Sequence, residues 1–137
     1  MIRRKQRLTD RRGTTALECA LVSPLVILLL MGMLLMGLGV FRYQQLQSLA
    51  REGARYASVH GPQYASENNT SQASTSTVLS YVDGLAVGLG GLDCTAVTYS
   101  ASSLPCTVSV TLTYTWTPGR LFSPTTWTVT STMPVTY

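Results

Sequence analysis

Two kinds of hydrophobic pattern divide the chain, and the first of them is helical. Residues Cys19–Phe41 contain no charged side chain, and 18 of these 23 residues are apolar. A helix of that length rises roughly 35 Å, which is enough to cross the hydrocarbon core of a membrane. Small and apolar residues then recur at helical spacing up to a Gly61-Pro62 stop signal. The pattern predicts one long helix over residues 14–61, with a transmembrane span over 19–41. The stripe consists of Leu46, Leu49, Ala50, Gly53, Ala54 and Ala57.

The second pattern is the strict alternation of β-strands. Every even position from Cys106 to Trp116 is apolar or aromatic, whereas the odd positions from 107 to 117 are all Thr or Ser. This alternation is typical of a strand with one buried face and one solvated face. Residues 126–137 repeat it after a turn rich in Pro and Gly, a weaker strand covers about 95–100, and a short helix covers about 76–90. The predicted fold is α+β: a long N-terminal helix, then a small domain with a short helix and a three-stranded antiparallel sheet.

Charge and composition divide the chain into four segments. Residues 1–13 form a basic leader, because six of the 10 Lys and Arg residues lie within residues 1–12. Residues 14–61 are the long helix, 62–77 a linker rich in Ser, Thr and Asn, and 78–137 the small domain. Beyond residue 12 the chain carries 4 basic and 5 acidic residues, so this part offers no basic face for nucleic acid.

The position of the basic residues also predicts an orientation. The positive-inside rule keeps the leader in the cytoplasm and sends the chain from about residue 42 across the membrane, so that residues 78–137 are exported. A cleaved secretory signal peptide is the alternative. The apolar run exceeds the roughly 7–15 residues of such a signal, and no A-x-A cleavage site follows it.

Few residues suggest chemistry. Of the three cysteines, Cys19 lies in the span, while Cys94 and Cys106 lie 12 residues apart on the exported side. An oxidising compartment favours a disulfide between this pair, worth about 3 kcal/mol, and two reduced, buried thiols are the alternative. Two cysteines and the lone His60 are too few for a zinc site. No catalytic triad, paired carboxylates or phosphate-binding loop is recognisable, which indicates a protein that is not an enzyme and needs no cofactor.

One constellation remains at the start of the long helix. Arg11-Arg12-Gly13-Thr14-Thr15-Ala16-Leu17-Glu18 joins the basic leader to the span. The order of basic leader, Gly, short neutral run, Glu and apolar helix resembles the type IV prepilin signal. With the continuation to Pro24, the segment Arg51–Ala57 and the β-rich ending, nearly the whole chain resembles the TadE-like family of the tight-adherence (Tad) pilus system. Cys19 departs from the pattern, because such sequences often carry Phe at this position.

The resemblance implies a minor pilin or pseudopilin that takes part in assembling or priming an adhesive pilus. A prepilin peptidase would cut between Gly13 and Thr14, and Glu18 would pair with the new amine of a neighbouring subunit. The implied partners are this peptidase, other pilins, pilus assembly-platform proteins and membrane lipid. The implied location is the bacterial cytoplasmic membrane, with an extracellular pilus as a further destination.

Two alternatives to this interpretation remain open. Thr15-x-x-Glu18 also matches a helix capping box, in which the acid serves only the local helix. The second alternative is a single-pass, signal-anchored surface domain that binds a partner without joining a filament and keeps its leader.

Overall fold

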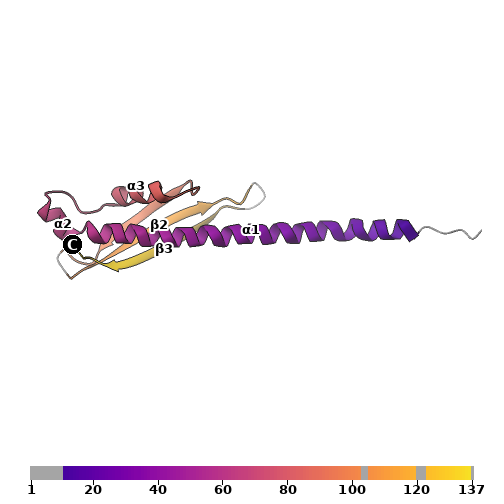
Figure 1. Ribbon diagram of the computed structural model, residues 1–137, viewed down its shortest axis with the longest axis horizontal. Helices are drawn as coiled ribbons and strands as arrows, with labels where there is room; N and C mark the ends of the chain where they lie inside the picture. The colour runs from indigo at the N-terminus through magenta and orange to yellow at the C-terminus, as the bar shows by residue number, and fades with distance from the viewer. Residues whose placement is uncertain (1–10, 103–104, 120–122, 137) are drawn as a thin grey trace, which may run out of the picture. The chain divides into compact units, whose positions relative to one another are not determined.

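The computed structural model describes residues 11–102, 105–119 and 123–136, and it confirms the predicted fold class. In these residues three helices precede three strands (Figure 1): α1 (Arg11–Val59), α2 (Pro62–Glu67), α3 (Thr75–Leu85), β1 (Leu92–Tyr99), β2 (Thr107–Trp116) and β3 (Thr125–Pro134). The chain divides between Leu38 and Gly39 into two compact units. The division falls within α1, so the second unit holds the rest of α1 and every later element.

The N-terminal unit is a helical segment whose side chains have no protein core to enter. Almost all of its large apolar side chains from Leu17 to Leu38 are exposed. Pro24 lies inside the helix without ending it, as membrane helices tolerate. Among the described helices, α1 alone is long and apolar enough to cross a membrane, judged by length and composition. So large an exposed apolar surface requires lipid or another protein chain around it.

The C-terminal unit is built on an antiparallel sheet with the strand order β1-β2-β3. The alternation predicted for residues 106–116 is confirmed, because Val108, Val110 and Leu112 of β2 are fully buried. The intervening residues form an outer face of hydroxyls that pair across the strands, as Thr111 and Thr130 do at 3.0 Å. The sheet therefore has one core face and one solvated face.

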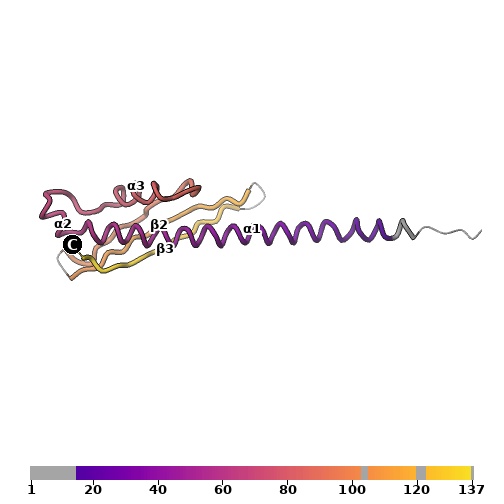
Figure 2. Tube along the Cα trace, viewed as in Figure 1, coloured from indigo at the N-terminus to yellow at the C-terminus, as the bar shows by residue number. Residues whose placement is uncertain are grey.

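The predicted stripe of small residues on α1 packs in the core of this unit, and the alanines of the stripe have no exposed surface. A β-carbon added at Gly53 would lie 3.1 Å from Val82 and 3.2 Å from Val78, both of α3, and 3.5 Å from Val110 of β2. Helices α1 and α3 and strand β2 thus meet at a residue without a side chain. Figure 2 follows the trace of α3 and of the second half of α1 alongside the strands.

Helix α3 ends at Leu85 rather than near residue 90. Val78 and Val82 are buried as the helical face predicts, but Leu85 is 47% exposed. Leu89 reaches the core from the following turn instead, where Gly88 has a φ of +75° that few other residues adopt. The connector before α3 contains the short helix α2, which has a proline in its first turn.

Strand β1 begins at Leu92, three residues before the start predicted from the sequence. The pairing register with β2 shifts between Cys94 and Ala96, which marks a bulge. Leu92 and Cys94 are buried before the bulge, whereas Val97 packs against the core after it. A bulge moves the buried positions from even to odd numbers, so an alternation test detects only part of this strand.

Candidate assembly and processing site

The predicted processing junction lies in the opening turn of α1. The helix begins at Arg11, so Gly13 and Thr14 are both helical in the uncut chain. Glu18 follows on the same helix and is exposed. The three residues singled out for processing and assembly therefore lie within two turns of one helix.

Glu18 stands at the end of an otherwise apolar side of α1. A shallow hollow on this side is lined by Glu18, Cys19, Val22, Ser23, Val26 and Ile27. Their spacing places them on one helix face. Cys19 and Ser23 have small side chains, and small residues allow a second helix to approach closely in a membrane. This face can accept a neighbouring helix along its apolar length and a cation at its carboxylate end.

The capping-box alternative for Glu18 does not fit the uncut chain. A capping box requires Thr15 to be the residue that precedes the first helical turn. Helix α1 begins four residues earlier, at Arg11, so Thr15 lies inside it. In the precursor Thr15 is therefore a residue within the helix rather than the residue before its first turn.

The predicted disulfide between Cys94 and Cys106 is wrong, because both are free, buried thiols. Cys94 pairs with Leu112 across the strands. Cys106 precedes Leu112 by six residues, which corresponds to roughly 20 Å along a strand. A disulfide needs its two Cα atoms within about 7 Å. Burial, and to a smaller extent the neighbouring Asp93 carboxylate, raises the pKa of the Cys94 thiol.

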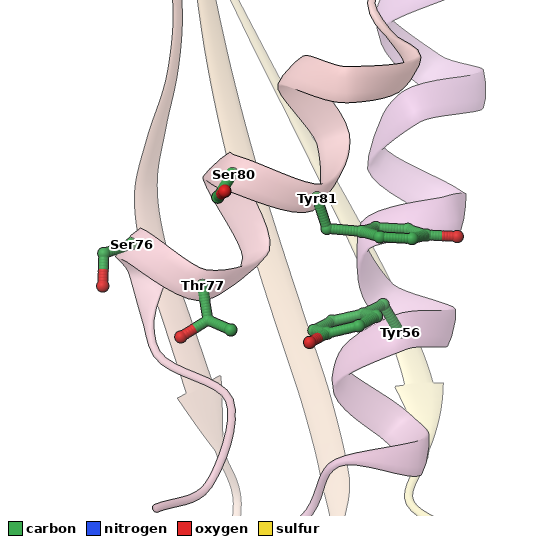
Figure 3. A pocket seen from close by; sticks show the side chains of 5 residues that line it. All are labelled: Tyr56, Ser76, Thr77, Ser80 and Tyr81. Carbon is green, nitrogen blue, oxygen red and sulfur yellow. The ribbon is translucent and has the colours of Figure 1, made fainter.

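A second hollow, of about 420 Å³, lies against α1 and α3 in the C-terminal unit (Figure 3). Tyr56 and Tyr81 stack there with ring centroids 4.5 Å apart. His60 also stacks on Tyr56, at 4.2 Å, and its Nδ1 lies 3.0 Å from the Tyr56 carbonyl oxygen. The polar groups that line the hollow are hydroxyls, which suit binding better than proton transfer. The lining consists of Tyr56, Ser76, Thr77, Ser80 and Tyr81.

Within residues 11–102, 105–119 and 123–136, no three His, Cys, Asp or Glu side chains gather into a group that could hold an ion.

Sequence reasoning missed an aromatic cluster at one end of the sheet, formed by Tyr43, Trp116 and Trp127. Trp116 ends β2 and stacks on Trp127 of β3, with ring centroids 5.2 Å apart and an angle of 26° between the rings. Tyr43 of α1 meets Trp127 edge-on at 6.0 Å and 82°. The available signal was the position of the two tryptophans on either side of one hairpin turn, since a hairpin brings such residues together.

Comparison with known proteins gives one finding for this site. Residues 13–55 match the family model described as TadE-like protein. The matched segment starts at the glycine of the predicted junction and ends within the part of α1 that packs on the sheet. No curated protein and no solved structure matches the chain.

Proposed function

We propose that the chain is a minor pilin or pseudopilin of the TadE-like family, whose model matches residues 13–55. It takes part in assembling or priming a Tad-type adhesive pilus. TadE-like proteins are not known as enzymes, and the role proposed here is structural. Its partners are a prepilin peptidase, other pilins, assembly-platform proteins and the lipid of the bacterial cytoplasmic membrane.

The observation that carries this proposal is the exposed apolar half of α1 together with the glycine and acid at its start. The apolar side chains of this half lie outside any protein core. A bilayer can cover them before assembly, and neighbouring helices can cover them in a filament. The basic leader favours a cytoplasmic N-terminus and an exported C-terminal unit.

Electrostatics favours a role for Glu18 between subunits. Cleavage after Gly13 would leave a charged amine on Thr14 at the rim of the hydrocarbon layer. An unpaired charge there is costly, and an opposite charge on an adjacent helix offsets part of the cost. The Glu18 carboxylate of a packed neighbour supplies that charge if the two helices are staggered by about one turn.

The rival function is the single-pass surface domain that binds a partner and keeps its leader. Its N-terminal residue in membranes would be Met1 or Ile2, whereas the pilin proposal expects Thr14. Intact-mass measurement on membrane extracts separates the two, in cells that contain the peptidase. A mature mass that still includes residues 1–13 would exclude the pilin role.

A substitution at Glu18 tests assembly separately from processing. In Glu18→Gln the side chain keeps its shape and loses its charge. We expect this variant to be cut after Gly13 and inserted in the membrane, yet to lose co-purification with other pilins and to form no filaments. Glu52→Gln, on the same helix but in the C-terminal unit, is the matched control and should assemble normally. Normal partner recovery and filament number with Glu18→Gln would contradict the assembly role.

A further inference from the structure

Both tryptophans of the chain lie in the aromatic cluster, and the cluster rests directly on the α1 backbone. A β-carbon added at Gly39 would lie 3.2 and 3.3 Å from two ring carbons of Trp116, and 3.8 Å from the Trp127 ring. The indole rings therefore touch α1 at Gly39, a contact that a larger residue would block. Tyr43, one turn further along α1, contacts the Trp127 ring in an edge-on arrangement.

Gly39 lies where the apolar run ends, counted along the sequence. A hydrocarbon core of about 30 Å takes about 20 helical residues at 1.5 Å each. A span that begins at Cys19 therefore leaves the hydrocarbon near Gly39. Phe41 is the last apolar residue of the run, and Arg42 is the first charged residue after it. The two tryptophans thus contact α1 at the level expected for the boundary between hydrocarbon and headgroups.

The turn between α3 and β1 also carries an exposed apolar side chain close to the end of the apolar run. The guanidinium Nη1 of Arg42 donates a hydrogen bond to the carbonyl of Gly88, in the turn between α3 and β1. The residue before Gly88 is Val87, whose side chain is 83% exposed. Phe41 is 55% exposed and Tyr43 is 40% exposed. Exposed apolar side chains thus occur both on α1 and on the turn between α3 and β1, at the level where the apolar run ends.

We propose that this end of the C-terminal unit is a membrane-contact surface, made of Phe41, Tyr43, Val87, Trp116 and Trp127. It rests in the interfacial layer of the same bilayer that α1 crosses. Trp and Tyr favour this layer, because their rings are apolar while the indole N–H and phenol O–H can reach water or headgroups. The Arg42 side chain suits the same depth, since its stem can lie along apolar surface while its charge stays at the polar side.

This inference rests on the membrane anchoring in the proposed function and is independent of pilus assembly. It adds a second point of attachment, so that the bilayer holds the β2–β3 end of the sheet as well as α1. The sheet would then be oriented by lipid rather than left to turn about a single helix.

The tryptophans themselves provide the test, since both lie in the surface. The full chain is reconstituted into phosphatidylcholine vesicles whose lipid is brominated either close to the headgroup or near the chain ends. We expect bromine close to the headgroup to reduce the tryptophan emission to about half, and bromine near the chain ends to have little effect. Trp116→Phe and Trp127→Phe each leave a single reporter, and both reporters should show the same order of quenching.

A pair of substitutions separates contact with lipid from a merely local packing role. Val87→Asp places a charge in the proposed surface and should weaken the quenching by shallow bromine. Val59→Asp, at the other end of α1 and also at an exposed valine, should leave the quenching unchanged. Equal quenching in the two variants would contradict the proposal.

Alkaline carbonate extraction tests the membrane anchoring separately from the membrane-contact surface, because an anchored protein is retained in the vesicles. Retained protein whose tryptophans are quenched by aqueous iodide and not by brominated lipid would overturn the membrane-contact surface alone. Retained protein that neither quencher reaches would also overturn it, since another protein chain would then cover the rings. Extracted protein would overturn both the anchoring and the inference.

Discussion

Gly53 lies where α1 meets α3 and β2, and its replacement by alanine measures how tightly the three elements pack. The new methyl group would lie 3.1 Å from a Val82 methyl and 3.2 Å from a Val78 methyl. Both valines are fully buried. Valine has one strongly preferred rotamer in a helix, so neither side chain can rotate away, and the two helices must shift by a few tenths of an ångström.

Two opposing terms set the magnitude of the effect. Alanine in place of glycine stabilises a helix interior by about 0.5–1 kcal/mol. Overpacking in a well-filled core costs about 1–3 kcal/mol. The free energy of unfolding of Gly53→Ala should therefore fall by about 0–2.5 kcal/mol, depending on how far the helices can separate.

The matched control is Gly84→Ala, also in a helix, where an added β-carbon would have no neighbour within 4 Å. Without an overpacking term, this variant should be neutral to about 1 kcal/mol more stable. The assay is denaturant unfolding of the full chain in detergent micelles, followed by tryptophan emission, since both tryptophans lie in the C-terminal unit. A change of midpoint at an unchanged slope reports stability.

The reasoning fails if the unfolding midpoint of Gly53→Ala equals or exceeds that of Gly84→Ala. A double variant strengthens the test. Val78→Ala removes one of the two closest methyl groups, so the loss in the Gly53→Ala, Val78→Ala double variant should be smaller than the sum of the single losses by about 0.5 kcal/mol or more. Strict additivity would indicate that Val78 and residue 53 do not press on each other.

Two further predictions concern titratable groups of the C-terminal unit. Burial, with a smaller effect of Cys106, raises the pKa of Tyr99 to about 12. The pKa of tyrosine in an unfolded chain is near 10. The neutral Tyr99 side chain therefore contributes fully to stability below pH 10, and this contribution is lost as the pH rises from about 10 to 12. Stability should therefore fall over this range more steeply in the wild type than in Tyr99→Phe, and identical pH profiles would contradict this. Unreduced, denatured protein should titrate all three cysteines as thiols, whereas Cys94 and Cys106 should react slowly in the folded protein because they are buried. Loss of two thiols in the denatured sample would show that the pair can be oxidised after all.

Elements with an unbroken period were predictable from the sequence. The alternation along β2 and the stripe on α1 each reflect a single buried face that runs the whole length of the element. Strand β1 was predicted only in part, because its bulge changes which positions are buried. The end of α3 was misplaced because Leu89 is as apolar as a helical core residue and enters the core from a turn.

The candidate site divides in the same way. The sequence alone predicted the apolar helix and the Gly13–Glu18 junction, because both are encoded in consecutive residues. The structure confirms the helix, and the junction stays a prediction. Only the tertiary structure decided that Cys94 and Cys106 stay apart and that Trp116 and Trp127 gather on Gly39. The physical reason is that strand register and the docking of a helix on a sheet set the distances between separate elements. Register and docking depend on the packing of the whole unit, and no local period along the chain records that packing.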